Sequence, residues 1–324
     1  MAQTSKLEKS VQIALENFMG LSNEEIFLVL TDEYLSEIGR VFFEVGKKIT
    51  NEALYVEMKA REINGQEPPE QIADLMKNVD VVVCPTYRSL THTDARREAS
   101  SRGVRIGTMP GITLETIERC FGANPDKIVE LTDMVYERMK RVSYVRVTTK
   151  AGTDFIMNIK GRRIIPSTGV LRKIGESGNL PSGEVYTAPW EKKSNGVIIF
   201  DGSFAGIGLL KNPIKVEVKN GYIQKIEGGK EASQLEEILN KAGKDANAVA
   251  EFGVGTNYKA KLCGQILEDE KVLGTIHIAF GNNVSMGGKI NVKSHLDGLV
   301  KKPTVYFDDV MVMKEGKFTK EMEV

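Results

Sequence analysis

The first 141 residues alternate short apolar runs with segments of helical periodicity. Runs rich in β-branched residues predict buried strands at residues 26–30, 53–58, 79–85 and 104–111. Amphipathic segments predict helices at residues 5–19, 33–48, 91–101 and 113–141. Thr91 and Thr93 are both candidate N-caps of the third helix. Because strands and helices alternate, we expect an α/β domain with a doubly wound, mostly parallel sheet.

The pattern changes after Ser143 to alternation of apolar and polar residues. Two alternating runs on either side of Lys150-Ala151-Gly152 predict a hairpin over residues 144–159. Similar alternation recurs at residues 197–200, 214–218, 222–226, 274–280 and 305–312, whereas the turn-rich residues 166–189 are expected to form an ordered loop. We therefore expect two domains, an N-terminal α/β domain over residues 1–143 and a C-terminal α+β domain over residues 144–324.

Composition excludes several classes of protein. The chain has 324 residues, 41% of them hydrophobic, which is enough for a buried core, and 44 basic residues balance 44 acidic ones. With no net charge to attract phosphates or anionic lipid, neither nucleic acid nor a membrane is an expected partner. Neither a bilayer-spanning apolar run nor a signal-peptide pattern occurs, and the three cysteines are far apart. Reduced thiols and a cytoplasmic location are expected.

Two glycine-rich segments invite comparison with phosphate-binding loops. Residues 201–208 read DGSFAGIG and residues 252–257 read FGVGTN. Neither matches the spacing of a dinucleotide-binding or P-loop motif, and both lie in the second half of the chain, outside the expected parallel sheet. We therefore interpret them as tight turns of a compact antiparallel domain.

The chain has only three histidines, and each has a distinctive setting. His295 and Asp297 are two residues apart, so on an extended segment both point to one face and could hold one cation. His277 lies in a predicted strand and shares a face with Thr275 and Ala279, which leaves room for an ion. The alternative is a buried imidazole that is hydrogen-bonded to a backbone carbonyl.

Two of the acidic residues have unusually apolar surroundings. Glu184 lies between two prolines and precedes Val185 and Tyr186, and Glu251 has apolar or glycine neighbours on both sides. Burying either carboxylate unpaired would cost several kcal/mol, so a cation or a hydrogen-bond network is expected to compensate it. The alternative is a partly exposed glutamate at the end of a strand.

Together these residues form a donor set that suits divalent metal ions. The five candidate ligands are Glu184, Glu251, His277, His295 and Asp297. Three carboxylates are more than one tetrahedral ion needs, so we expect a two-metal site for Zn, Co or Mn with a bridging water. Such a water attacks an amide or ester carbonyl, and Glu184 or Glu251 could act as the general base.

The same residues resemble the thermophilic aminopeptidases of the aminopeptidase T and aminopeptidase S group. The matching segments are residues 181–189, with Glu184; residues 251–257, with Glu251; residues 274–281, with His277; and the pair His295 and Asp297. The resemblance implies two domains, a dinuclear centre, cleavage of N-terminal residues from a small peptide substrate, and a homodimer. In that family a tyrosine follows the first histidine, but here residues 281–284 read GNNV.

The chain also resembles the dihydroxypyridine dioxygenases, which share this architecture. That resemblance implies a mononuclear Fe(II) centre held by His277, His295 and Asp297, which opens the ring of a small-molecule substrate. It also implies an acid–base role for His92, which follows a predicted parallel strand. The two extra glutamates favour a metal-dependent aminopeptidase, with the ring-cleaving dioxygenase as the alternative and a non-enzymatic binding scaffold as a third hypothesis.

Overall fold

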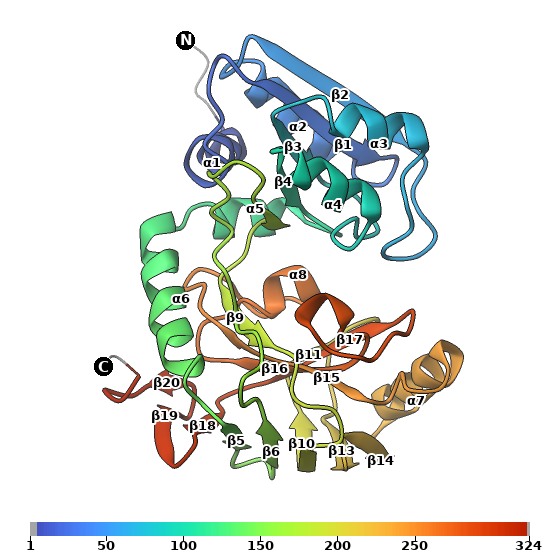
Figure 1. The fold of residues 1–324 in the computed structure, drawn as a ribbon, viewed down its shortest axis with the longest axis vertical. Helices are drawn as coiled ribbons and strands as arrows, with labels where there is room; N and C mark the ends of the chain where they lie inside the picture. Colours follow the sequence, from blue (N-terminus) through green and yellow to red (C-terminus); the bar gives the residue numbers. More distant parts are fainter. Residues whose placement is uncertain (1–4, 323–324) are drawn as a thin grey trace. The chain divides into compact units, whose positions relative to one another are not determined.

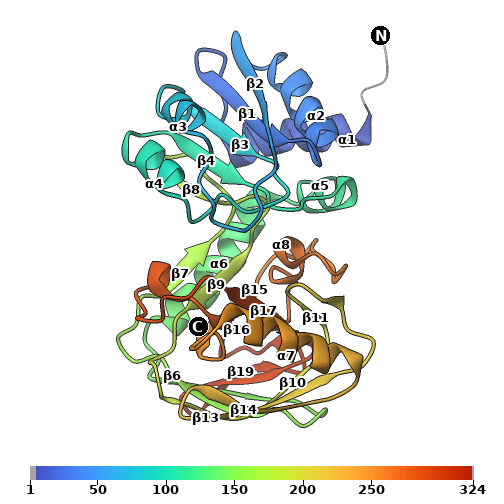
Figure 2. The ribbon, with the colours of Figure 1, turned by 90° about the vertical axis from the view of Figure 1, so that its right-hand side faces the viewer.

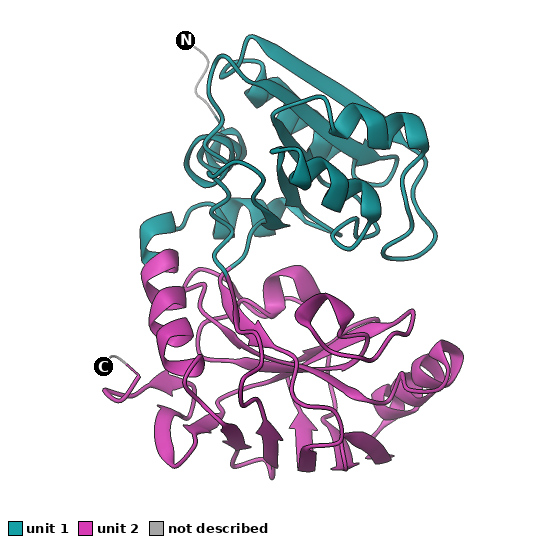
Figure 3. Ribbon diagram, viewed as in Figure 1, with its two compact units in different colours: residues 1–127, 167–182 teal, residues 128–166, 183–324 magenta. Residues whose placement is uncertain are grey.

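The computed structural model describes residues 5–322 and divides into two compact units, coloured separately in Figure 3. The first unit comprises residues up to 127 together with residues 167–182, and the second comprises residues 128–166 and the chain from residue 183 onward. This division differs from the single boundary expected between residues 143 and 144. The reason is that a segment from the middle of the chain contributes a strand to the sheet of the first unit.

The first unit is built on a five-stranded sheet in which every pair of neighbouring strands is parallel (Figure 1). The strand order is β2-β1-β3-β4-β8, and the four strands predicted in this part of the chain are all confirmed. Their bounds are β1 Ile26–Asp32, β2 Glu52–Met58, β3 Val81–Cys84, β4 Arg105–Thr108 and β8 Ser177–Asn179.

Helices cover both faces of this sheet, as Figure 2 shows. One layer contains α1 (Lys6–Ile13), which continues as a short π-helix, with α2 (Ser36–Gly46) and α5 (Leu114–Cys120). The other contains α3 (Glu70–Met76) and α4 (Asp94–Ser101). The expected doubly wound architecture is therefore confirmed.

Local capping explains where several of these helices begin. Ser5 and Glu8 form a reciprocal capping box at the start of α1. Of the two candidate caps of α4, Thr93 is the one whose side chain accepts a hydrogen bond from Arg96 N. The single helix expected over residues 113–141 is instead two helices, α5 and α6 (Pro125–Met139), because Pro125 cannot continue the preceding helix and suits a first helical position.

The second unit contains two largely antiparallel sheets stacked face to face, as both Figure 1 and Figure 2 show. The eight-stranded sheet has the order β14-β13-β10-β6-β5-β18-β19-β20. Its bounds are β5 Tyr144–Thr148, β6 Asp154–Asn158, β10 Ser194–Phe200, β13 Ile214–Lys219, β14 Tyr222–Glu227, β18 Thr304–Phe307, β19 Val310–Lys314 and β20 Lys317–Phe318. The predicted hairpin over residues 144–159 is confirmed, whereas the single run expected at 305–312 is a hairpin with a turn at Asp308.

The seven-stranded sheet has the order β12-β11-β17-β16-β15-β9-β7. Its bounds are β7 Ile165–Ser167, β9 Glu184–Thr187, β11 Ser203–Phe204, β12 Gly208–Leu209, β15 Val249–Gly255, β16 Ile276–Gly281 and β17 His295–Val300. Residues 166–189, expected as a loop, thus include β8, β9 and most of β7. Most of α6 also belongs to this unit, together with α7 (Lys230–Ala242), which contacts β13 and β14, and α8 (Ile266–Asp269), which contacts β11.

The hydrophobic core of the second unit lies between its two sheets. Phe252, Ile278 and Phe280 of the seven-stranded sheet join a buried cluster with Phe155 and Ile198 of the eight-stranded sheet. Because side chains alternate along a strand, the residues between these core positions point to the opposite face of the seven-stranded sheet. That face carries the candidate site.

Within residues 5–322, no helix has the length and apolarity needed to cross a bilayer. No two of the cysteines in that range form a disulfide.

Candidate metal centre

The five predicted ligands all lie on neighbouring strands of the seven-stranded sheet. Glu184 begins β9, Glu251 lies in β15, His277 in β16, and His295 and Asp297 in β17. Each is offset by one residue from a core position, such as Val185, Phe252, Ile278 or Leu296. The sequence therefore brings all five side chains to one face of one sheet.

Small residues on this face create the space for the larger polar groups. Ala279 of β16 is paired with Glu251 on one side and with Asp297 on the other, so the residue that separates the two acidic residues across the strands has only a methyl side chain. Gly253 is paired with His277, and a Cβ atom on Gly253 would come within 2.1 Å of His277 Nε2. The imidazole of His277 therefore occupies the place that a side chain at position 253 would take.

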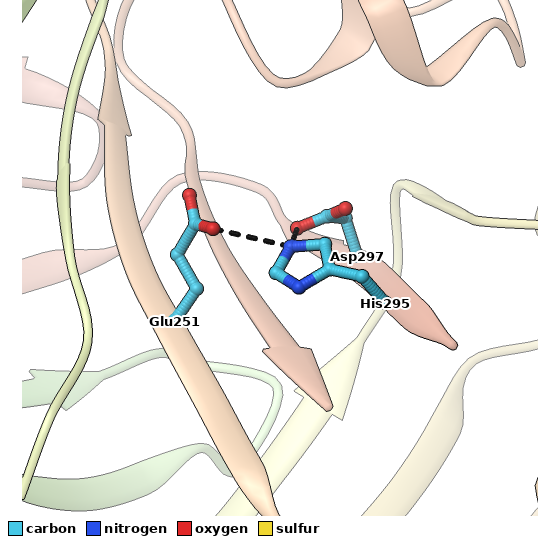
Figure 4. A group of neighbouring side chains, drawn as sticks. All are labelled: Glu251, His295 and Asp297. Atoms are coloured by element: carbon cyan, nitrogen blue, oxygen red, sulfur yellow. Dashed lines mark ion pairs between the residues drawn. The ribbon is translucent and has the colours of Figure 1, made fainter. Parts of the chain in front are cut away.

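Glu251, His295 and Asp297 offer three donor atoms that all lie within 4.8 Å of one another (Figure 4). His295 Nε2 is 3.1 Å from Glu251 Oε2 and 3.4 Å from Asp297 Oδ1. Both carboxylates are buried, and Asp297 Oδ1 has no hydrogen-bond partner. Two buried carboxylates and an imidazole around one point are a donor set that fits a single divalent cation.

The orientation of the His295 ring is set by its other nitrogen. Nδ1 lies 2.7 Å from the main-chain oxygen of Asn282, which can only accept, so Nδ1 carries a proton. In the neutral ring Nε2 then has a lone pair directed at Glu251 and Asp297. This is the arrangement by which a backbone carbonyl prepares a histidine to bind a metal.

His277 and Glu184 adjoin these three residues but are engaged differently. His277 Nε2 lies 3.1 Å from Glu251 Oε1 and 3.6 Å from Glu184 Oε2. Glu184 Oε1 accepts a hydrogen bond of 2.7 Å from the Lys271 ammonium, which also donates to Glu270 Oε2 at 2.6 Å. The structure thus brings all five predicted residues together, while metal ligation by any of them stays a prediction.

The charges of this cluster shift the pKa values of its members in the metal-free protein. Burial opposes protonation of His277, but its hydrogen bond to Glu251 and the surrounding carboxylates raise its pKa to about 9. The pKa of His295 is raised as well. Burial lowers this pKa, but Asp297 and Glu251 outweigh that effect and raise it well above the ordinary value. Although burial acts in the opposite direction, these two imidazoles lower the pKa of Glu251, and His295 is the main group that lowers the pKa of Asp297.

Sequence reasoning missed the partners of Glu184. Lys271 has a side chain that is only 1% exposed, and neither it nor Glu270 was a candidate. Burial raises the pKa of Glu270 to about 8 despite the neighbouring ammonium. Burial would favour the neutral form of Lys271, but Glu184 and Glu270 raise its pKa above the ordinary value. Their only sequence signal is that the pair lies a few residues before the strand of His277, which does not distinguish Lys271 from other lysines.

His92 lies in the first unit, in the segment between β3 and α4. Its side chain is exposed, and its main-chain oxygen accepts a hydrogen bond of 2.8 Å from Arg97 Nη1. The acid–base role that the resemblance implies for His92 stays a prediction.

Two solved structures share the fold of this chain. 2,5-Dihydroxypyridine dioxygenase from Pseudomonas putida KT2440 is similar with a TM-score of 0.84 and 19% identity, covering 99% of this chain and 100% of that one. Wild-type AmpT from Thermus thermophilus is similar with a TM-score of 0.70 and 16% identity, covering 97% of this chain and 99% of that one. At these identities the two likenesses establish the architecture alone.

Sequence comparison separates the two families. A curated 2,5-dihydroxypyridine 5,6-dioxygenase of Pseudomonas putida is 24% identical over an alignment of 245 residues that covers 70% of this chain and 68% of that protein. A model of the family described as 2,5-dihydroxypyridine 5,6-dioxygenase matches residues 29–320. These findings overturn the prediction of a metal-dependent aminopeptidase. The assignments as a hydrolase, an aminopeptidase and a protease were wrong, and the resemblance to the dihydroxypyridine dioxygenases was the correct one. The chain is an enzyme and belongs to the 2,5-dihydroxypyridine 5,6-dioxygenase family.

Proposed function

We propose that this enzyme is a mononuclear Fe(II) dioxygenase that opens the ring of a dihydroxylated pyridine or a closely related phenolic substrate. The family match over residues 29–320 carries this proposal. The convergence of Glu251, His295 and Asp297 around a single position supports it, because this geometry suits one ion.

In this proposal Glu251, His295 and Asp297 would hold the metal. Ferrous iron at this position would supply the redox chemistry that the reaction of an aromatic ring with dioxygen requires. The two carboxylates balance the charge of the ion, and the Nδ1–H group of His295 holds the ring in place through Asn282 O.

His277 is proposed to orient the site. Its Nε2–H donates to Glu251 Oε1 at 3.1 Å, which fixes one carboxylate oxygen and leaves Glu251 Oε2 facing His295 Nε2. Gly253 makes this contact possible, because any side chain there would displace the imidazole.

The proposal is tested with protein purified and loaded with Fe(II) under anaerobic conditions. Oxygen consumption is measured after addition of 2,5-dihydroxypyridine, together with the loss of the ring absorbance. We expect one oxygen molecule consumed per ring opened, and none with the zinc-loaded protein, because zinc has no redox chemistry.

A panel of other dihydroxylated aromatic rings then defines the substrate, and aminoacyl-p-nitroanilides serve as the negative control. Iron-loaded protein that consumes no oxygen with any of these rings would contradict the proposal.

A further inference from the structure

Lys271 is the one buried cation, apart from histidine, that contacts the candidate ligands within residues 5–322. Its side chain is 1% exposed, and its ammonium bridges Glu184 Oε1 at 2.7 Å and Glu270 Oε2 at 2.6 Å. Buried ammonium groups are costly unless they are paired, and here two carboxylates provide the pairing. The ammonium therefore compensates the charge of Glu184, which would otherwise require another cation.

Alternating charges connect Lys271 with the donor cluster. Glu184 Oε2 lies 3.6 Å from His277 Nε2, which in turn is 3.1 Å from Glu251 Oε1. Glu184 Oε2 has no hydrogen-bond partner, so this oxygen faces His277 while the other is held by the ammonium. Every carboxylate in this network of side chains, from Glu270 at one end to Asp297 at the other, thus has an ammonium or imidazole group as a neighbour.

The backbone holds Lys271 in this place. Its main-chain oxygen accepts a hydrogen bond of 2.8 Å from Asn257 N, just beyond the end of β15. A Cβ atom on Gly255 would come within 2.8 Å of the carbonyl carbon of Lys271 and within 2.2 Å of Val272 O. Close packing against a glycine therefore fixes the segment that delivers the ammonium to Glu184.

We propose that the Lys271 ammonium takes the place of a second metal ion, so that the cluster of five candidate ligands holds one ion instead of two. Glu184 is the one carboxylate among the five candidate ligands that lies outside the donor set of Glu251, His295 and Asp297, and one of its oxygens is already bound by a fixed positive charge. A divalent cation at the same position would have to displace that charge and would be repelled by it at close range. This inference deepens the proposed function but rests only on the metal centre, and it concerns the number of ions bound.

The test is metal stoichiometry, measured by elemental analysis and by calorimetric titration of the metal-free full chain with Co(II). We expect the wild-type chain to bind one Co(II). We expect Lys271→Met, which keeps the length of the side chain but removes its charge, to bind two, with the second ion lost again in Lys271→Met/Glu184→Gln. The exposed Lys261, changed to Met, is the matched control and is expected to bind one.

Lys271→Met leaves two buried carboxylates without their cation and could fail to fold. The double variant Lys271→Met/Glu270→Gln removes one of these charges and gives a second route to the same measurement. We expect its melting temperature to rise more on addition of Co(II) than that of the wild-type chain, because a second ion then stabilises it.

Two results would overturn the inference: two ions in the wild-type chain, or a single ion in folded Lys271→Met/Glu270→Gln at saturating Co(II). Neither depends on turnover. A chain that binds one ion but consumes no oxygen would contradict the proposed function and leave the role of Lys271 intact.

Discussion

Val249 and Glu251 are only two residues apart in β15, yet their side chains point to opposite faces of the sheet. Val249 joins the hydrophobic core, whereas Glu251 contacts His277 and His295. A β-bulge explains the difference, because Val249 pairs with Phe280 and Glu251 with Ala279, which leaves Ala250 as an extra residue. Bulges next to functional sites commonly redirect a side chain in this way.

Ala279 determines whether a metal fits between the strands. We expect Ala279→Leu to abolish metal binding, because its side chain would fill the space between Glu251 and Asp297. Ala279→Ser is the control and should retain the ion, since it adds a single oxygen atom. Elemental analysis and circular dichroism provide the measurements. An Ala279→Leu protein that still holds one equivalent of metal would show that the ion does not bind between these carboxylates.

The two histidines of the cluster have separable roles. We expect His295→Ala to lose metal retention while the fold is kept, because its side chain is 30% exposed and supplies a donor atom. In His277→Gln we expect the ion to be retained with affinity lowered by about 10- to 100-fold, the range typical of residues that orient a ligand. Dissociation constants from competition with a chelator distinguish the two. Equal loss in both variants would make His277 a ligand.

Gly253 and His277 should be energetically coupled. Gly253→Ala places a methyl group where the imidazole lies, and such overpacking typically costs about 1 to 3 kcal/mol of unfolding free energy. In the background of His277→Ala the same change should cost much less, because the ring is gone. Urea unfolding of the two single variants and the double variant measures the coupling. Additive effects would mean that the two residues do not compete for space.

The metal-free protein should lose stability as pH rises from about 6.5 to 9. The folded state raises the pKa of His277 to about 9 from its usual 6.5, so it binds more protons than the unfolded state in this interval. The stabilisation is complete below pH 6.5 and is lost as His277 deprotonates, and His295 acts in the same direction. Melting temperatures measured with a chelator present test this, with His277→Gln expected to show a flatter profile.

His92 is predicted to act in turnover and not in metal binding. We expect His92→Gln to bind one equivalent of iron and to melt as the wild type does, since the side chain is exposed. Loss of a general acid or base typically lowers the rate by about 100- to 10,000-fold. Steady-state oxygen consumption at several pH values measures the effect. Unchanged turnover in this variant would remove His92 from the reaction.

Local patterns predicted the strands of the parallel sheet and the common face of the five candidate ligands. Runs such as residues 26–30 and 79–85 are rich in β-branched side chains, so the strands could be recognised without tertiary information. The spacing of His295 and Asp297 likewise fixes their common face wherever the strand lies.

Non-local features could not be predicted in this way. β8 has the sequence Ser177-Gly178-Asn179, which carries no strand signal, and it is a strand only because β4 pairs with it. The burial of Lys271 depends on Glu184, which is distant in the sequence. The number of metal ions could not be predicted from the sequence either. In our proposal one ammonium favours a single ion, and a count of candidate ligands does not reveal that effect.

The late position of β8 in the chain has a consequence for synthesis on the ribosome. β4 ends at Thr108, but the strand that covers its edge begins at Ser177. At translation rates of about 5 to 20 residues per second, that edge stays open for roughly 4 to 14 seconds after β4 has been made. During this interval the nascent chain presents an unpaired parallel edge, which is a site for wrong pairing. We therefore expect nascent chains that stall before residue 177 to be the species that chaperones must protect.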